Sequence, residues 1–194
     1  TRLVADFEAA WYRLRDQALE ALIGLAGTLS EDQVEAFIAE LEERQAEYEA
    51  EYLPRTDEEY REDALERLED SLGDYLGRLD DAQEQRLAAA VEELRRIDGD
   101  WLAVRAAWVD RLSVLLAREP GWEGRLRASV RDWEAWVPES YIAGTNHNSA
   151  VVLSAVTDVL ALRSERQQAR LERELAALAR DLNKLMVPST QQAL

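Results

Sequence analysis

Apolar residues recur at intervals of three and four positions along nearly the whole chain. An α-helix with this spacing carries its apolar side chains on one face and its charged side chains on the opposite face. Alternation of apolar and polar residues, which would indicate strands, does not extend over any useful length. The pattern therefore predicts an all-α protein. It places helices over about 3–27, 30–53, 57–79, 80–118, 122–136, 148–162 and 164–186.

The apolar stripes also predict which helix faces are buried. A strict four–three alternation in the last helix resembles a coiled-coil seam, which packs either inside the monomer or against another copy. The stripe of the first helix is Val4, Phe7, Trp11, Leu14, Ala18, Leu22 and Leu25, and that of the last is Leu171, Leu175, Leu178, Leu182 and Leu185.

Helix starts and ends are marked by polar and helix-breaking residues. The pattern Ser/Asp-x-x-Gln, in which the first side chain and the glutamine cap each other's backbone amides, occurs at 30–33, 80–83 and 164–167. Because the spacings between these copies are unequal, we favour shared cap chemistry over an internal repeat. Asp57 is expected to cap the third helix, and Pro54 to end the second.

The predicted helix over 80–118 is the longest, at roughly 58 Å. Asp98-Gly99-Asp100 interrupts it, but its apolar stripe keeps the same phase on both sides, so we favour one bent helix. Helices of this length with short connections indicate an elongated antiparallel helical bundle with partly coiled-coil-like helices. We expect a single domain over 1–187 and a flexible tail over 188–194.

The segment 141–149, YIAGTNHNS, contains the only histidine of the chain. We interpret it as an irregular connection in which Gly144 turns the chain and Asn146 or Asn148 caps the next helix. The alternative is a small binding or catalytic site at His147. A metal site needs several ligands and a di-iron bundle needs Glu-x-x-His motifs, none of which occurs here, so the turn is favoured.

Tryptophans cluster before this segment. Buried aromatic residues that anchor helix crossings explain most of them, whereas an exposed aromatic groove for a peptide or a lipid chain is the alternative. If the protein binds anything, the expected interaction surface comprises Trp122, Trp133, Trp136, Tyr141, Asn146 and His147.

The charge balance restricts the partners. Forty acidic residues against 23 basic ones give a net charge of −17, which opposes binding to nucleic acid or to anionic lipid and suits a basic protein surface. The absence of cysteine excludes disulfides and thiolate metal sites within this chain. No apolar run of about 18 residues occurs, which predicts no transmembrane helix in this sequence.

Acidic residues are densest over 35–70. We interpret this stretch as a solvated helix surface, partly neutralised by pairs such as Glu40–Arg44 and Asp63–Arg67. The alternative is weak binding of divalent cations by carboxylates aligned at intervals of four: Glu43, Glu47 and Glu51.

The order of these features resembles an uncharacterised family of helical lipoproteins from Gram-negative bacteria, over about residues 7–187. The resemblance lies in LSEDQVEAFIAELEERQAEYEAEYL, TDEEYREDALERLEDSLGDYLGRLDDAQ, NHNS, SERQQARL and LARDLNKL. It implies a signal peptide, a lipid-modified cysteine and a further N-terminal part, none of which lies in this sequence. We therefore expect the C-terminal part of a larger protein at the periplasmic face of the envelope, anchored in the outer membrane.

No catalytic residue, metal or cofactor is assigned by these patterns. We expect a non-enzymatic domain of a cell-envelope lipoprotein that acts through protein–protein contacts. The alternative is a carrier or chaperone-like module that holds a hydrophobic ligand or peptide between helices. An enzyme is the third and least favoured hypothesis.

Overall fold

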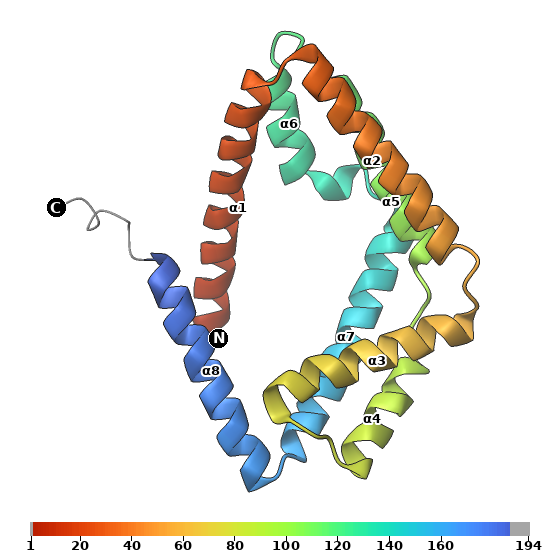
Figure 1. The fold of residues 1–194 in the computed structure, drawn as a ribbon, viewed down its shortest axis with the longest axis vertical. Helices are drawn as coiled ribbons and strands as arrows, with labels where there is room; N and C mark the ends of the chain where they lie inside the picture. Colours follow the sequence, from red (N-terminus) through yellow and green to blue (C-terminus); the bar gives the residue numbers. More distant parts are fainter. Residues whose placement is uncertain (1, 187–194) are drawn as a thin grey trace, which may run out of the picture. The chain divides into compact units, whose positions relative to one another are not determined.

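The computed structural model describes residues 2–186, and side chains over residues 12–181. Within them the chain is all helix and turn, as predicted, with no strand (Figure 1). The helices are α1 (Arg2–Thr28), α2 (Glu31–Tyr52), α3 (Asp57–Leu76), α4 (Asp81–Val91), α5 (Asp98–Leu116), α6 (Trp122–Arg131), the 3₁₀ turn η1 (Trp133–Ala135), α7 (Glu139–Ala161) and α8 (Glu165–Met186).

The chain packs as two compact units. Unit 1 combines the segment up to residue 54 with 97–143, and unit 2 combines 55–96 with the segment from residue 144. Unit 1 therefore holds α1, α2, α5, α6 and the first turn of α7, whereas unit 2 holds α3, α4, the rest of α7 and α8. The single domain over 1–187 stays a prediction, and the tail over 188–194 lies outside the described residues.

The core of unit 1 is built where α1, α2, α5 and α6 meet. Helices α2 and α5 lie side by side (Figure 1). Burial of this apolar surface stabilises the unit, because each fully buried leucine or isoleucine contributes about 1.5–3 kcal/mol. The core residues are Leu19, Ile23, Ile38, Leu115, Leu116, Trp122 and Leu126.

The core of unit 2 joins α3, α4 and α7, and α8 packs along α3. Two buried glutamines lie beside this core. Gln167 Nε2 donates to Gln83 Oε1 at 2.9 Å, and Gln83 Nε2 donates to Gln167 Oε1 at 3.3 Å and to the Val159 carbonyl. The apolar core residues are Leu72, Leu76, Leu79, Leu87, Ala90, Ala155 and Val159.

The three predicted capping patterns are confirmed as reciprocal capping boxes. Those at 30–33 and 80–83 open α2 and α4, and the one at 164–167 opens α8 through hydrogen bonds of 2.9 and 3.3 Å. The third helix differs from the prediction, because Thr56 is its cap and Asp57 is its first residue. Thr56 forms a fourth capping box with Glu59, which the Ser/Asp-x-x-Gln pattern does not include.

The prediction of one bent helix over 80–118 is wrong. Helix α4 ends at Val91 in a tight turn, and α5 begins only at Asp98. The Asp98-Gly99-Asp100 sequence lies in the first turn of α5. Acidic side chains at this position stabilise the helix through their interaction with the positive end of its dipole. The break lies over 92–97, a short stretch whose sequence keeps the helical apolar phase.

Candidate functional site

The prediction of an irregular connection at 141–149 is also wrong. Helix α7 starts directly after Pro138 and continues through the whole segment, with buried Gly144 inside it. The amides of Tyr141 and Ile142 donate to the Pro138 carbonyl at 3.1 and 3.2 Å. Pro138 therefore opens this helix, a position at which a proline loses no helical hydrogen bond.

Two polar residues of this segment, His147 and Asn148, hydrogen-bond the backbone of the stretch between α4 and α5. His147 Nε2 lies 2.8 Å from the Glu93 carbonyl oxygen. The Asn148 amide accepts from the Arg95 N–H at 2.9 Å and donates to the Arg95 carbonyl at 2.8 Å. The Tyr60 hydroxyl donates to the same carbonyl at 3.2 Å. These side chains thus hydrogen-bond backbone groups that α4 and α5 leave unpaired, which is a structural role.

The six residues of the expected interaction surface lie in both units. Trp122 is buried in the core of unit 1, and Trp133 is 40% exposed. Trp136 is half-buried and stacks on Trp108, with ring centroids 5.8 Å apart. Half-buried Tyr141 also belongs to unit 1, whereas exposed Asn146 and half-buried His147 belong to unit 2. An interaction surface formed by these residues stays a prediction.

Unit 1 contains an open groove of about 460 Å³ between α1, α2, α5 and α6, here called the apolar groove. Among the described residues that line it, only Gln33 has a polar side chain, apart from the indole N–H of Trp108. Leu22 and Leu25 are each 59% exposed, and Phe37 is 44% exposed. The groove is lined by Leu19, Leu22, Leu25, Ala26, Leu29, Gln33, Phe37, Trp108, Leu112, Leu116, Leu126 and Val130.

The apolar groove exists because α1 has two apolar faces. The predicted stripe through Leu14, Leu22 and Leu25 is exposed, and the neighbouring positions Leu19 and Ile23 are buried instead. The expectation that the predicted stripe faces the core is therefore wrong over this part of the helix. The signal was present in the sequence, since Leu19 and Ile23 repeat at the same helical spacing beside the predicted stripe.

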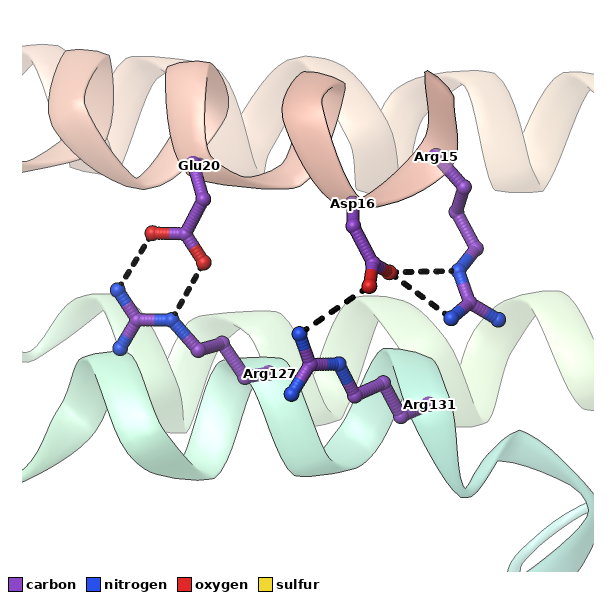
Figure 2. Close-up of polar contacts among 5 residues, drawn as sticks. All are labelled: Arg15, Asp16, Glu20, Arg127 and Arg131. Atoms are coloured by element: carbon purple, nitrogen blue, oxygen red, sulfur yellow. Dashed lines mark hydrogen bonds and ion pairs between the residues drawn. The ribbon is translucent and has the colours of Figure 1, made fainter. Parts of the chain in front are cut away.

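An ion-pair network joins α1 to α6 in unit 1 (Figure 2). Two parallel hydrogen bonds of 2.7 Å run from Arg127 to Glu20. Asp16 accepts from Arg131 at 3.3 Å and from Arg15 at 2.8 and 3.1 Å. Bidentate arginine–carboxylate geometry of the kind that Figure 2 shows fixes the relative position of two helices more tightly than a single contact.

These contacts lower the pKa values of the Glu20 and Asp16 carboxyl groups. The hydrogen bond from Arg127 holds the pKa of Glu20 below its ordinary value of 4.5, and Glu20 in turn raises the pKa of Arg127. The hydrogen bond from Arg15, together with the charge of Arg131, holds the pKa of Asp16 below 3.8. Both carboxylates therefore stay ionised in the folded protein down to a lower pH than in the unfolded chain.

The acidic stretch over 35–70 forms ion pairs only in part as predicted. Arg44 pairs with Glu40 at 2.7 Å, as expected, but the carboxylate of Asp63 pairs with Arg55. Among the residues that the structure describes, no group of three or more Asp, Glu or His side chains is placed to hold a metal ion. None of the helices over 2–186 is both long enough and apolar enough to cross a membrane.

Comparison with protein families places the chain in a known family. The family DUF6279, described as a family of unknown function, matches residues 1–142. The matched region includes α1 to α6, that is, nearly all of unit 1 and the first two helices of unit 2. No curated protein and no solved structure matches the chain. The expectation of an uncharacterised family is therefore confirmed, and its lipoprotein character stays a prediction.

Proposed function

We propose, from the premise that this chain belongs to the DUF6279 family of unknown function, that it is a non-enzymatic helical module that binds another protein. The observation that carries the proposal is the apolar groove of unit 1. Its wall exposes large apolar side chains (Leu22, Leu25 and Phe37) in one place. Contiguous apolar surface of this kind marks interaction sites, whereas single exposed leucines do not.

The side chains of this chain that are best suited to acid–base chemistry already have structural partners, which supports a role in binding over one in catalysis. His147, the only histidine, lies against the Glu93 carbonyl, and Asn148 is committed to the backbone of Arg95. A general base needs a ring nitrogen within reach of a substrate proton. The Nε2 atom of His147 instead lies against the backbone between α4 and α5.

We test the groove with paired leucine substitutions in the purified domain. Leu22→Asp places a charge in the apolar groove, and Leu153→Asp places one at a leucine of α7 that is 69% exposed and outside that groove. Both variants are immobilised and incubated with cell-envelope extract after circular dichroism confirms their helicity. We expect Leu22→Asp to lose a specific partner that the wild type and Leu153→Asp retain. Equal retention by all three proteins, or turnover of a substrate, would contradict the proposal.

We also propose that the full-length protein is a lipoprotein at the periplasmic face of the outer membrane. The resemblance of 29–53 and 56–83 to helical envelope lipoproteins supports this location. Metabolic labelling of the full-length protein with a palmitate analogue is the test. We expect label to be incorporated and to sediment with the outer membrane; an unlabelled protein would contradict the location while leaving the groove proposal intact.

A carrier of hydrophobic ligands is the second candidate, favoured by the nearly apolar lining of the apolar groove. Trp108 lines the groove and reports occupancy through its fluorescence. Titration of palmitate into the wild type and into Trp108→Phe distinguishes the carrier from the protein-binding module. A saturable change in the wild type that is lost in Trp108→Phe favours the carrier.

A further inference from the structure

A second groove of unit 1, here called the acidic groove, lies between α2 and the C-terminal end of α5. It measures about 610 Å³. The two grooves are lined by different residues of α2: Val34, Glu35 and Ile38 line the acidic groove, whereas Gln33 and Phe37 line the apolar groove. The acidic groove is lined by Glu31, Val34, Glu35, Ile38, Ala39, Glu42, Ser113, Leu116, Ala117 and Arg118.

The acidic groove combines an apolar floor with a charged rim. Buried Ile38 and Leu116 lie in its floor, and half-buried Val34 extends it. Three exposed glutamates (31, 35 and 42) line the rim at intervals of four and seven residues along α2. At 1.5 Å per residue these carboxylates extend over roughly 16 Å, or three helical turns.

The net charge of this groove is negative. Helix α2 carries nine acidic residues against one arginine, Arg44. Arg118, the one basic residue among the described residues that line the groove, directs its guanidinium to the carbonyls of Ala26 and Leu29 at the end of α1. The C-terminal end of α5 adds the negative pole of a helix dipole.

We propose that the acidic groove binds an amphipathic basic helix of the protein partner. This inference rests on the proposed protein-binding function and specifies the partner's chemistry. An apolar strip of that helix packs on Val34, Ile38 and Leu116, and lysine or arginine side chains spaced seven residues apart face Glu35 and Glu42. Complementary charge sets orientation and association rate, while the apolar floor supplies contact area.

The charge requirement is tested with two fluorescein-labelled synthetic helical peptides that share a leucine face. One carries lysines and the other glutamates along the edge of that face. Each is titrated against the wild type, Glu35→Gln/Glu42→Gln, and the control Glu43→Gln/Glu47→Gln, which removes the same charge from exposed positions of α2 outside the groove.

We expect anisotropy to show binding of the lysine peptide alone. The groove variant should weaken it about 10-fold and the control less than about 2-fold. Equal weakening by both variants, binding of the glutamate peptide, or no binding of either peptide overturns the inference.

Photo-crosslinking separates this inference from the proposed function. A benzophenone side chain is placed in the intact domain at exposed Ala39 in the acidic groove or at Leu22 in the apolar groove. Each protein is then exposed to the partner retained from envelope extract. Adducts from Ala39 that depend on Glu35 and Glu42 support the inference. Adducts from Leu22 alone contradict it and leave the proposed function standing, and adducts from neither contradict both.

Discussion

At the scale of single residues, two polar side chains of α7 hydrogen-bond the backbone of a distant segment. Asn148 presents both ends of its amide to residue 95, and His147 reaches the carbonyl of residue 93. These backbone groups lie between α4 and α5, outside the hydrogen bonds of either helix. The unusual composition of 141–149 is therefore explained by a break in the chain about 50 residues earlier.

Asn148→Ala is expected to lower the free energy of unfolding by about 1–2 kcal/mol, because it removes two hydrogen bonds to Arg95. Asn146→Ala is the matched control, since it makes the same change at an exposed position of the same helix. The gain in helix propensity is common to both variants, so their difference isolates the contacts of Asn148. Urea denaturation measures both, and equal midpoints would contradict the assigned role.

Gly77 and Gly73 are expected to respond oppositely to alanine. Gly77 ends α3 at φ 80° and ψ −148°, a conformation that costs other residues about 1–3 kcal/mol, so Gly77→Ala destabilises. Gly73 lies inside the helix, and an added Cβ would meet no atom within 4 Å beyond the local helix backbone, so Gly73→Ala stabilises by up to about 1 kcal/mol. Thermal melts of both variants test the pair. A rise in melting temperature for Gly77→Ala would contradict this account.

At the scale of helices, the capped starts of α2, α4 and α8 can be predicted from the sequence, whereas the break between α4 and α5 cannot. Capping boxes are local, so the residues at 30–33, 80–83 and 164–167 predict their own contacts. The break at 92–97 depends on Asn148, a partner far along the chain, and the apolar stripe keeps its phase across it. Gln83 and Gln167 show the same difference between local and distant contacts. Their capping contacts with Asp80 and Ser164 are predictable from the sequence, whereas the hydrogen bonds between their two side-chain amides are not.

Gln167→Ala is expected to destabilise unit 2 by about 2–4 kcal/mol, since it removes the glutamine half of the α8 capping box and leaves the buried Gln83 amide without this partner. Gln168→Ala, at a half-buried neighbour with solvent-facing hydrogen bonds, should cost less than about 0.5 kcal/mol. Chemical denaturation of both variants measures the difference. Similar losses in the two would show that the buried amide pair contributes little.

The contact between α1 and α6 is expected to weaken in acid. The pKa values of Glu20 and Asp16 are lowered on folding, so their contribution is complete above the ordinary values of 4.5 and 3.8. That contribution is lost as the pH falls through the lower values of the folded state. Melting temperatures measured from pH 6 to pH 2 should therefore fall less steeply in Glu20→Gln than in the wild type. Identical slopes would contradict a stabilising role for the network.

At the scale of the whole molecule, periodicity predicts the all-α class but not the packing. The apolar spacing predicts one buried stripe on each helix, yet α1 buries Leu19 and Ile23 and exposes Leu22 and Leu25. Which of two apolar faces is buried depends on contacts with α5 and α6, far along the chain. The two compact units and both grooves also depend on contacts between helices that are far apart in the sequence, which explains why residue spacing does not predict them.

The central claim is that the apolar groove of unit 1 is a protein-binding surface, and photo-crosslinking in living cells tests it most directly. The full-length protein carries a benzophenone side chain at Leu22 or, as the control, at Leu153 on α7. The account predicts one discrete protein adduct from Leu22 and none from Leu153. Absence of an adduct from Leu22, or the same adduct from both positions, would contradict it.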